Sequence, residues 1–202
     1  MQGYTIIQNY LQQFIEKKKK LNSDNIMDGI ELIQKSKQIE DIQIITIDPS
    51  FQRLIYESLK PNTKKKRCSV KQFTLFNNYF QNDLVVIPFH RIEHWSLIIY
   101  YKKYNLFLHF DSADIHHSKF HSFVKLCNTH FVNNAISFVF PTSKQLDSWS
   151  CGEYLILFYF AFHIFRSNLV DVHMKRDQFI EILKVYIDQI QIIYVNGKPK
   201  LF

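Results

Sequence analysis

The sequence predicts an α+β fold of the papain-like kind, in which a central, mainly antiparallel sheet is flanked by helices. Two observations on composition indicate a globular domain. The chain has 202 residues, and 47% of them are hydrophobic while only 21% are charged. The third observation is the order of the elements, because runs suited to strands gather in the middle of the chain with helical patterns before and after them.

The first part of the chain is predicted to be mostly helical. In order, we expect an amphipathic lead-in at residues 1–20, a helix within 21–34, a strand at 42–47, a helix from Pro49 to about Leu59 and a basic loop at 61–67. Residue 22 or 23 can cap the second of these segments, which carries three isoleucines on one face.

The remainder contains the other strands. We expect strands at 84–88, 94–101, 105–111 and 136–140, and helices over about 118–131, from Cys151 through the apolar run that ends at residue 165, and over about 176–193. A two-residue turn at Lys102-Lys103 is predicted between the strands at 94–101 and 105–111. Since no linker is apparent, we expect one domain over residues 1–202, with a core at 21–165 and a helical C-terminal segment at 166–202.

Composition excludes several classes of protein. The four glycines stand apart, so no phosphate-binding loop of the GxGxxG or GxxxxGK[ST] type is present. The formal net charge of +7 includes the basic runs Lys17–Lys20 and Lys64–Arg67, which lack interleaved aromatic residues. We therefore expect solvated basic surfaces, with nuclear import as an alternative role for the runs, and no nucleic-acid partner.

The cysteines and the apolar segments indicate the cellular compartment in which the protein is expected. The three cysteines form no CxxC pair, which favours a reducing compartment over a disulfide framework. The N-terminus shows no signal-peptide pattern, and the uncharged run Tyr154–Phe165 is shorter than the roughly 18–20 residues that span a bilayer. We expect an intracellular protein of the nucleus or cytoplasm, monomeric, with no membrane partner.

Cys151 is the candidate nucleophile. It follows the polar segment PTSKQLDSWS and directly precedes the apolar helix, with Gly152 beside it. Unpaired N–H groups and the dipole at a helix N-terminus stabilise a thiolate, and a glycine allows another backbone to approach closely. A buried structural cysteine at a helix start is the alternative interpretation.

A thiol nucleophile needs a base and a group that orients the base. If Lys102-Lys103 is a two-residue turn, His94 and Asp111 face each other across neighbouring strands, with Cβ atoms roughly 4.5–5.5 Å apart. The carboxylate could then accept the Nδ1–H bond and leave Nε2 free for the thiol proton. A longer turn would change this register and let Asp114 compete, and an ordinary half-buried histidine is the alternative for His94.

Gln145 lies six residues before Cys151 in the segment that leads to it. Its side-chain amide could donate, together with the backbone N–H of Cys151, to an oxyanion that develops beside the sulfur. A solvent-exposed glutamine is the alternative, since that is the usual state of this residue type.

The motifs HWSLIIY, FDSA and QLDSWSCG occur in the order His, Asp, Gln, Cys. Together with KLNSDNI and LVVIPFHRIEHW, they resemble the ubiquitin-like-protein-specific cysteine proteases, the SUMO/sentrin and Rub/Nedd deconjugating peptidases of the adenain-like clan. The resemblance covers roughly residues 20 to 165. It implies a triad of His94, Asp111 and Cys151, an oxyanion role for Gln145, and cleavage after the C-terminal Gly-Gly of a ubiquitin-like modifier, either in precursor maturation or in release from lysine. It also implies no metal and no cofactor.

The resemblance further implies that Trp95 helps to wall a narrow channel for the Gly-Gly tail, and that Gly152 and Trp149 contribute to substrate binding. The sequence departs from the family at Lys20, where a tryptophan is usual, and at Ser23 and Ser150, where aspartate is frequent. These departures remove no catalytic group. The absence of the tryptophan does remove one expected wall of the channel, and the candidates to replace it are Trp149, Phe51 and Phe89.

A zinc site is the less favoured interpretation of a histidine-rich segment. His117, His121, Cys127 and His130, with His116 adjacent, fall in one predicted helix. At 1.5 Å per residue the outer two lie about 20 Å apart, so one straight helix cannot wrap these groups around a single ion. A surface helix with several histidines is the preferred interpretation.

Three alternatives to a modifier-specific peptidase stay open. The clan includes acetyltransferases with a similar triad, processing proteases of viruses or mobile elements cut ordinary polypeptides, and an inactive domain could bind a modifier without cutting it. Intact His94, Asp111, Gln145 and Cys151 argue against the last of these.

Overall fold

The computed structural model describes residues 2–36, 42–58, 69–140, 142, 144–167, 175–189, 192–195 and 198–201. The chain forms two compact units, each assembled from segments far apart in sequence. The first comprises Met1–Glu40, Phe110–Ala113 and Phe140–Phe202, and the second comprises Asp41–His109 and Asp114–Val139. Helices and a mainly antiparallel five-stranded sheet make up an α+β fold, as the sequence predicts.

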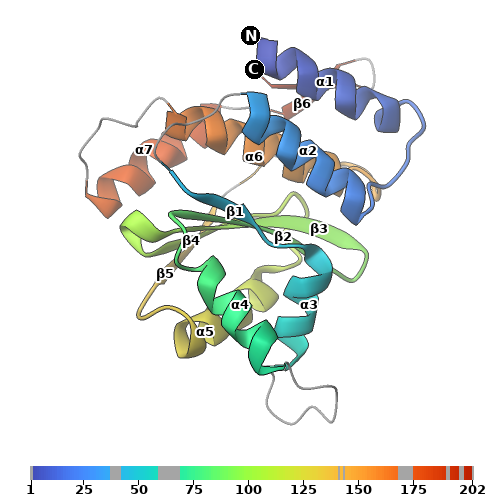
Figure 1. Cartoon of the computed structure of the whole chain (residues 1–202). Helices are drawn as coiled ribbons and strands as arrows, with labels where there is room; N and C mark the ends of the chain where they lie inside the picture. The colour runs from blue at the N-terminus through green and yellow to red at the C-terminus, as the bar shows by residue number, and fades with distance from the viewer. Residues whose placement is uncertain are drawn as a thin grey trace. The chain divides into compact units, whose positions relative to one another are not determined.

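The second unit is built around the sheet. Its strands follow the order of the chain: β1 (Ile44–Thr46), β2 (Leu84–Arg91), β3 (His94–Tyr101), β4 (Leu106–Phe110) and β5 (Ile136–Phe140). The first pair is parallel, β2 and β3 are antiparallel, and the short connection from β3 to its neighbour β4 requires an antiparallel pair as well. Helices α3 (Pro49–Ser58), α4 (Val70–Tyr79) and α5 (His117–His130) lie on the same side of this sheet (Figure 1).

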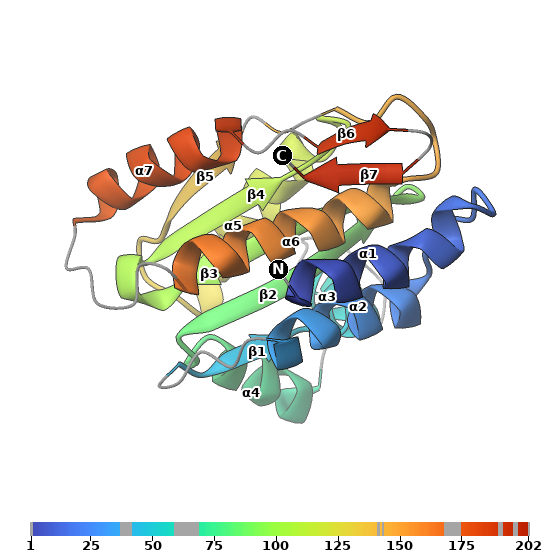
Figure 2. The same cartoon turned by 90° about the horizontal axis from the view of Figure 1, so that it is seen from above.

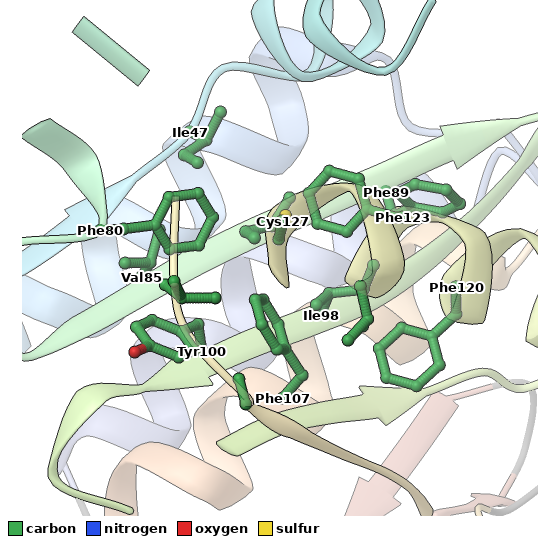
Figure 3. Close-up of a cluster of buried hydrophobic side chains, with 14 of the residues drawn as sticks. Ile47, Phe80, Val85, Phe89, Ile98, Tyr100, Phe107, Phe120, Phe123 and Cys127 are labelled. Carbon is green, nitrogen blue, oxygen red and sulfur yellow. The ribbon is translucent and has the colours of Figure 1, made fainter. Parts of the chain in front are cut away.

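The core of the second unit lies between these helices and the sheet and is strongly aromatic (Figure 3). Phe80 illustrates the packing: its ring centroid lies 5.3 Å from that of Tyr100 and 6.0 Å from that of Phe107, both edge-to-face. Cys127 belongs to the same cluster and is 1% exposed. Burial raises the pKa of its thiol well above the usual value, so Cys127 is a structural thiol rather than a nucleophile.

The first unit is mainly helical. It contains α1 (Gln2–Ile15), α2 (Ser23–Ser36), α6 (Cys151–Ser167), α7 (Arg176–Gln189) and the hairpin of β6 (Ile192–Val195) with β7 (Lys198–Leu201). Helix α2 contacts both α1 and α6, and the three helices are seen together in Figure 2. The Tyr10 hydroxyl donates to the carbonyl of Asn25 (2.6 Å), and Gln34 donates to the Tyr159 hydroxyl (3.1 Å).

Helix α6 is buried from Cys151 through Arg166, with only Ile164 partly exposed. The helix is enclosed on all sides, in keeping with the absence of a polar face from residues 154–165. No helix in the described ranges combines the length and the apolar composition that crossing a bilayer requires.

The structure differs from the predicted elements in three places. The connection between β3 and β4 is not a two-residue turn, since Lys102–Tyr104 form a 3₁₀ turn and Asn105 has a left-handed backbone with φ 48°. The final helix ends at Gln189 instead of about 193, and a hairpin follows, so the C-terminal segment is not helical throughout. Helix α4 was not predicted, although Ser69 and Gln72 form a capping box at its start. Cys68 and the basic loop at 61–67 lie outside the described residues.

Candidate active site

The residues predicted for the site belong to both units. Cys151, Asp111 and Gln145 are in the first unit, together with Trp149 and Gly152, whereas His94 and Trp95 are in the second. Each group is described below within its own unit.

Cys151 is the first residue of α6 and is 3% exposed. The carbonyl of Ser150 accepts the first hydrogen bond of the helix, from Tyr154 N (3.1 Å), which makes Ser150 the cap. The Asp147 carboxylate holds this cap in place, accepting from the backbone N–H of Trp149 (2.9 Å), the N–H of Ser150 (2.8 Å) and the Ser150 hydroxyl (2.9 Å). The chain thus presents Cys151 at a braced helix N-terminus, where the helix dipole favours negative charge.

Asp147 was missed in the sequence, although aspartate is a typical residue for the Asx turn that it forms with the N–H groups two and three residues ahead. Ser150, the position where the resembled family often has aspartate, is fully buried and engaged in this turn. The departure at Ser150 therefore leaves the helix start intact.

Gln145 is tied to the residue that follows Asp111. The Ser112 hydroxyl donates to Gln145 Oε1 (2.7 Å), and the Gln145 backbone N–H donates to the Ser112 carbonyl (3.1 Å). The Gln145 Nε2 atom donates to the Asp147 carbonyl (2.8 Å). Because an amide nitrogen carries two N–H groups, this bond uses one of them. Gln145 is therefore a fixed side chain, and Ser112 is a positioning group that the sequence reasoning passed over within FDSA.

Asp111 directly precedes Ser112 and is 1% exposed. One carboxylate oxygen accepts from the Ala113 backbone N–H (3.0 Å), and the Asp111 carbonyl accepts from the Thr142 hydroxyl (2.7 Å). These bonds fix both the backbone and the carboxylate, as an orienting group requires.

Gly152 has a packing role that the sequence did not specify. A Cβ on Gly152 would lie 2.8 Å from Leu21 Cβ and 3.1 Å from Ile26 Cδ1. Leu21 and Ile26 come from the KLNSDNI motif, so the glycine lets this segment press against the first turn of α6. The exposed side of the loop ahead of α6 is marked by Leu146, which is 96% exposed, and by the half-buried Trp149.

In the second unit, His94 begins β3 directly after a tight hairpin turn. Arg91 pairs with His94, and the two residues between them, Ile92 and Glu93, have positive φ values of 49° and 57°. Two successive left-handed residues make a type I′ turn, which matches the twist of an antiparallel pair. The His94 side chain is 5% exposed.

Trp95 is 4% exposed and packs its indole on His90 of the neighbouring strand, with ring centroids 4.3 Å apart. The pKa of His90 is lowered, mainly by burial and further by the positive charge of Arg53. This tilted ring contact helps to hold Trp95 in place, next to His94 in the chain.

The longer β3–β4 turn changes the predicted register by two residues. The direct pairing expected from a two-residue turn therefore no longer follows. A shift of two leaves every side chain on the same face, and the hydrogen bond from His109 Nε2 to Ser96 Oγ (3.1 Å) shows which residues of the two strands share that face.

His116 is a second buried histidine beside His94, with ring centroids 4.8 Å apart. It is 1% exposed and lies immediately before α5. The sequence reasoning grouped it with a helix of surface histidines, an interpretation that is wrong for His116 but right for His121 and His130, which are exposed. Cys127 of the same helix points into the aromatic core. The residues considered for a zinc site therefore lie in different environments: His116 is buried beside His94, Cys127 is in the core, and His121 and His130 are exposed.

Comparison with known proteins finds likeness in structure. No family model matches the chain, and no curated protein matches its sequence. The effector protein XopD of Xanthomonas campestris, solved bound to ubiquitin, is similar with a TM-score of 0.58 and 12% identity over 85% of this chain and 91% of that one. A de-sumoylating protease is similar with a TM-score of 0.55 and 18% identity, over 87% and 76%.

The C-terminal protease domain of Ulp1, solved in complex with Smt3, the yeast ortholog of SUMO, has a TM-score of 0.54 and 12% identity over 86% of this chain and 77% of that one. These likenesses are consistent with the resemblance that the motifs carry. The chain has the fold of the Ulp1-like SUMO proteases.

Proposed function

We propose that the protein is a cysteine peptidase that cleaves after the C-terminal Gly-Gly of a ubiquitin-like modifier, to mature a precursor or to release the modifier from lysine. The observation that carries this proposal is the start of α6. There, Cys151 begins a buried helix directly after a loop whose glutamine is hydrogen-bonded to the residue following Asp111. Together with the fold of the SUMO proteases, this arrangement supports a role for Cys151 as the nucleophile.

The proposed chemistry begins with transfer of the Cys151 thiol proton to His94 Nε2, while Asp111 accepts the Nδ1–H bond and holds the imidazole. The thiolate attacks the carbonyl carbon of the terminal glycine of the modifier. Gln145 Nε2 and the Cys151 backbone N–H donate to the oxyanion that forms. His94 then returns the proton to the leaving amine, which produces a thioester. Water hydrolyses the thioester, freeing the modifier's carboxylate and the thiol.

The neighbours support a modifier as substrate. Two of them were solved with Smt3 and with ubiquitin. The formal net charge of +7 would favour encounter with an acidic partner, an effect on association rate more than on specificity. We extend the proposal to SUMO, Rub/Nedd and ubiquitin as candidate modifiers.

Hydrolysis of fluorogenic substrates tests the proposal. SUMO, Rub/Nedd and ubiquitin, each with a fluorophore amide-linked to the last glycine, are compared on the wild type and on the Cys151→Ala variant. We expect the wild type to cleave at least one of them and Cys151→Ala to cleave none. Cleavage of Gly-Gly peptides without cleavage of any modifier would instead favour a processing protease, and acetyl transfer to a protein without hydrolysis would favour a transferase.

A further inference from the structure

His116 stands at a position that normally serves its own helix. It is the N-cap of α5, where a serine, threonine, asparagine or aspartate side chain usually accepts a backbone N–H of the first turn. The His116 side chain makes no such bond. Instead it turns to the β2–β3 hairpin, so local helix stability is given up for a contact beside His94.

The hydrogen bonds of His116 show that Nε2 carries a proton. The Arg91 carbonyl, which can only accept, lies 2.9 Å from His116 Nε2, so Nε2 carries a proton. In the neutral ring, Nδ1 then accepts from the hydroxyl of Ser96 at 3.1 Å. Ser96 Oγ in turn accepts from His109 Nε2, also at 3.1 Å. The result is a directed chain of donors from β4 through β3 to the hairpin turn.

This chain ends on a turn with two left-handed residues. A positive φ is unfavourable for a β-branched side chain such as Ile92, so the conformation has to be held from outside. Arg91, the residue before the turn, is held through both its side chain and its backbone carbonyl. Its guanidinium bonds Glu57 (3.1 Å) and lies over the Tyr56 ring of α3 (4.3 Å), while its carbonyl receives the His116 N–H.

We infer that His116 is a positioning residue for His94, acting on the base through the Arg91 carbonyl and through direct ring contact. The inference rests on the proposed function, in which His94 is the base. With Ser96 and His109 behind it, His116 keeps the hairpin and the His94 imidazole in one orientation. Loss of the N–H donated to Arg91 would let the base sample unproductive orientations and lower kcat without weakening substrate binding.

Two amide substitutions separate the two bonds of His116. In His116→Gln, the amide nitrogen reaches as far along the side chain as Nε2 and can donate to the Arg91 carbonyl. In His116→Asn, the amide reaches only as far as Nδ1, so the Ser96 bond can form but the Arg91 bond cannot. Asparagine is also a favourable N-cap, which supports folding of the variant. His121→Asn, an exposed change on the same helix, is the matched control.

The readout is steady-state hydrolysis of the modifier substrate that the wild type cleaves best. We expect His116→Asn to lower kcat by about 10- to 100-fold with KM within about twofold, His116→Gln to restore kcat to within about threefold of wild type, and His121→Asn to change neither. An unchanged kcat in His116→Asn, or equal losses in the Asn and Gln variants, would overturn the positioning role.

Nitrogen-15 spectra of histidine-labelled wild type give a second measurement that needs no variant to fold. We expect Nε2 of His116 to carry a proton, and a proton on Nδ1 alone would contradict the hydrogen-bond chain. Failure of the wild type on every modifier overturns the proposed function instead. The two failures are therefore distinguishable.

Discussion

Glu153 is a carboxylic acid in the first turn of α6 that is 0% exposed. Burial, with a smaller contribution from the negative charge of Asp147, raises its pKa from 4.5 to about 8. A helix N-terminus favours a charged carboxylate, yet here burial outweighs the dipole. Glu153 is therefore a neutral acid at pH 7, two residues after the candidate nucleophile.

This burial makes stability depend on pH. Between the unfolded pKa of 4.5 and the folded pKa of about 8, the native state holds a proton that the unfolded state has lost, so stability falls as pH rises through this window. We expect the Glu153→Gln variant to gain about 3 kcal/mol of unfolding free energy relative to wild type between pH 5 and pH 8. Urea unfolding at a series of pH values measures this difference. A difference that does not change with pH would show that Glu153 is not buried as an acid.

Ser112 is expected to affect catalysis through Gln145, whose side chain it holds by a hydrogen bond. Replacing it with alanine removes the hydroxyl that donates to Gln145 Oε1 at 2.7 Å. If Gln145 donates to the oxyanion, we expect Ser112→Ala to lower kcat by about tenfold, less than the 10²–10³ typical of removing an oxyanion donor itself, with KM little changed. Steady-state hydrolysis checks this, and Gln145→Ala is the reference. A Ser112→Ala enzyme with full kcat would separate the serine from catalysis.

At the scale of elements, the β2–β3 hairpin has an unusual turn. Asparagine followed by glycine is the preferred pair for a type I′ turn, whereas this chain has Ile92 and Glu93. Ile92 is 82% exposed, so its side chain contributes little burial. We expect Ile92→Asn to raise the free energy of unfolding by about 1 kcal/mol, because asparagine tolerates a left-handed backbone. Thermal unfolding measures the gain; a lower Tm would mean that Ile92 makes contacts which outweigh the strain.

The contact of α2 with α6 depends on glycine. A Cβ at Gly29 would lie 2.6 Å from Ile156 Cδ1, the end of a side chain that can move, whereas a Cβ at Gly152 would lie 2.8 Å from Leu21 Cβ, which is fixed to the backbone. We expect Gly152→Ala to lower the free energy of unfolding by about 1–3 kcal/mol through overpacking. Gly29→Ala is the matched comparison and should have the smaller effect, since helix propensity favours alanine by up to about 1 kcal/mol. Equal losses in the two variants would contradict this difference.

Element by element, the sequence predicted what periodicity and composition encode. The apolar runs of α6 and of the central strands were recognisable because elements buried on all sides are almost continuously apolar. The β3–β4 connection was not, because a 3₁₀ turn closed by a left-handed Asn105 looks the same in sequence as a two-residue turn. Helix α4 was overlooked because its apolar residues are few, although Ser69 and Gln72 carried a capping signal.

For the whole molecule, the order of His94, Asp111, Gln145 and Cys151 carried the functional prediction, and the fold agrees with it. What the sequence could not provide was the support around these residues. The bonds of Ser112 to Gln145 and of His116 to the Arg91 carbonyl join residues 33 and 25 positions apart. Such contacts depend on tertiary structure, so a single histidine or serine in the sequence gives no sign of them.

The central claim is that Cys151 attacks the C-terminus of a ubiquitin-like modifier. Its most direct test is intact-protein mass spectrometry after incubation with SUMO, Rub/Nedd and ubiquitin probes that carry an electrophile in place of the last glycine. Wild type, Cys151→Ala and Cys127→Ala are compared, the last because it removes a thiol from the core. We predict that wild type and Cys127→Ala gain the mass of at least one probe, mapped to Cys151, and that Cys151→Ala gains none. A wild type left unmodified by all three probes, or a Cys151→Ala variant modified as fully as wild type, would contradict the claim.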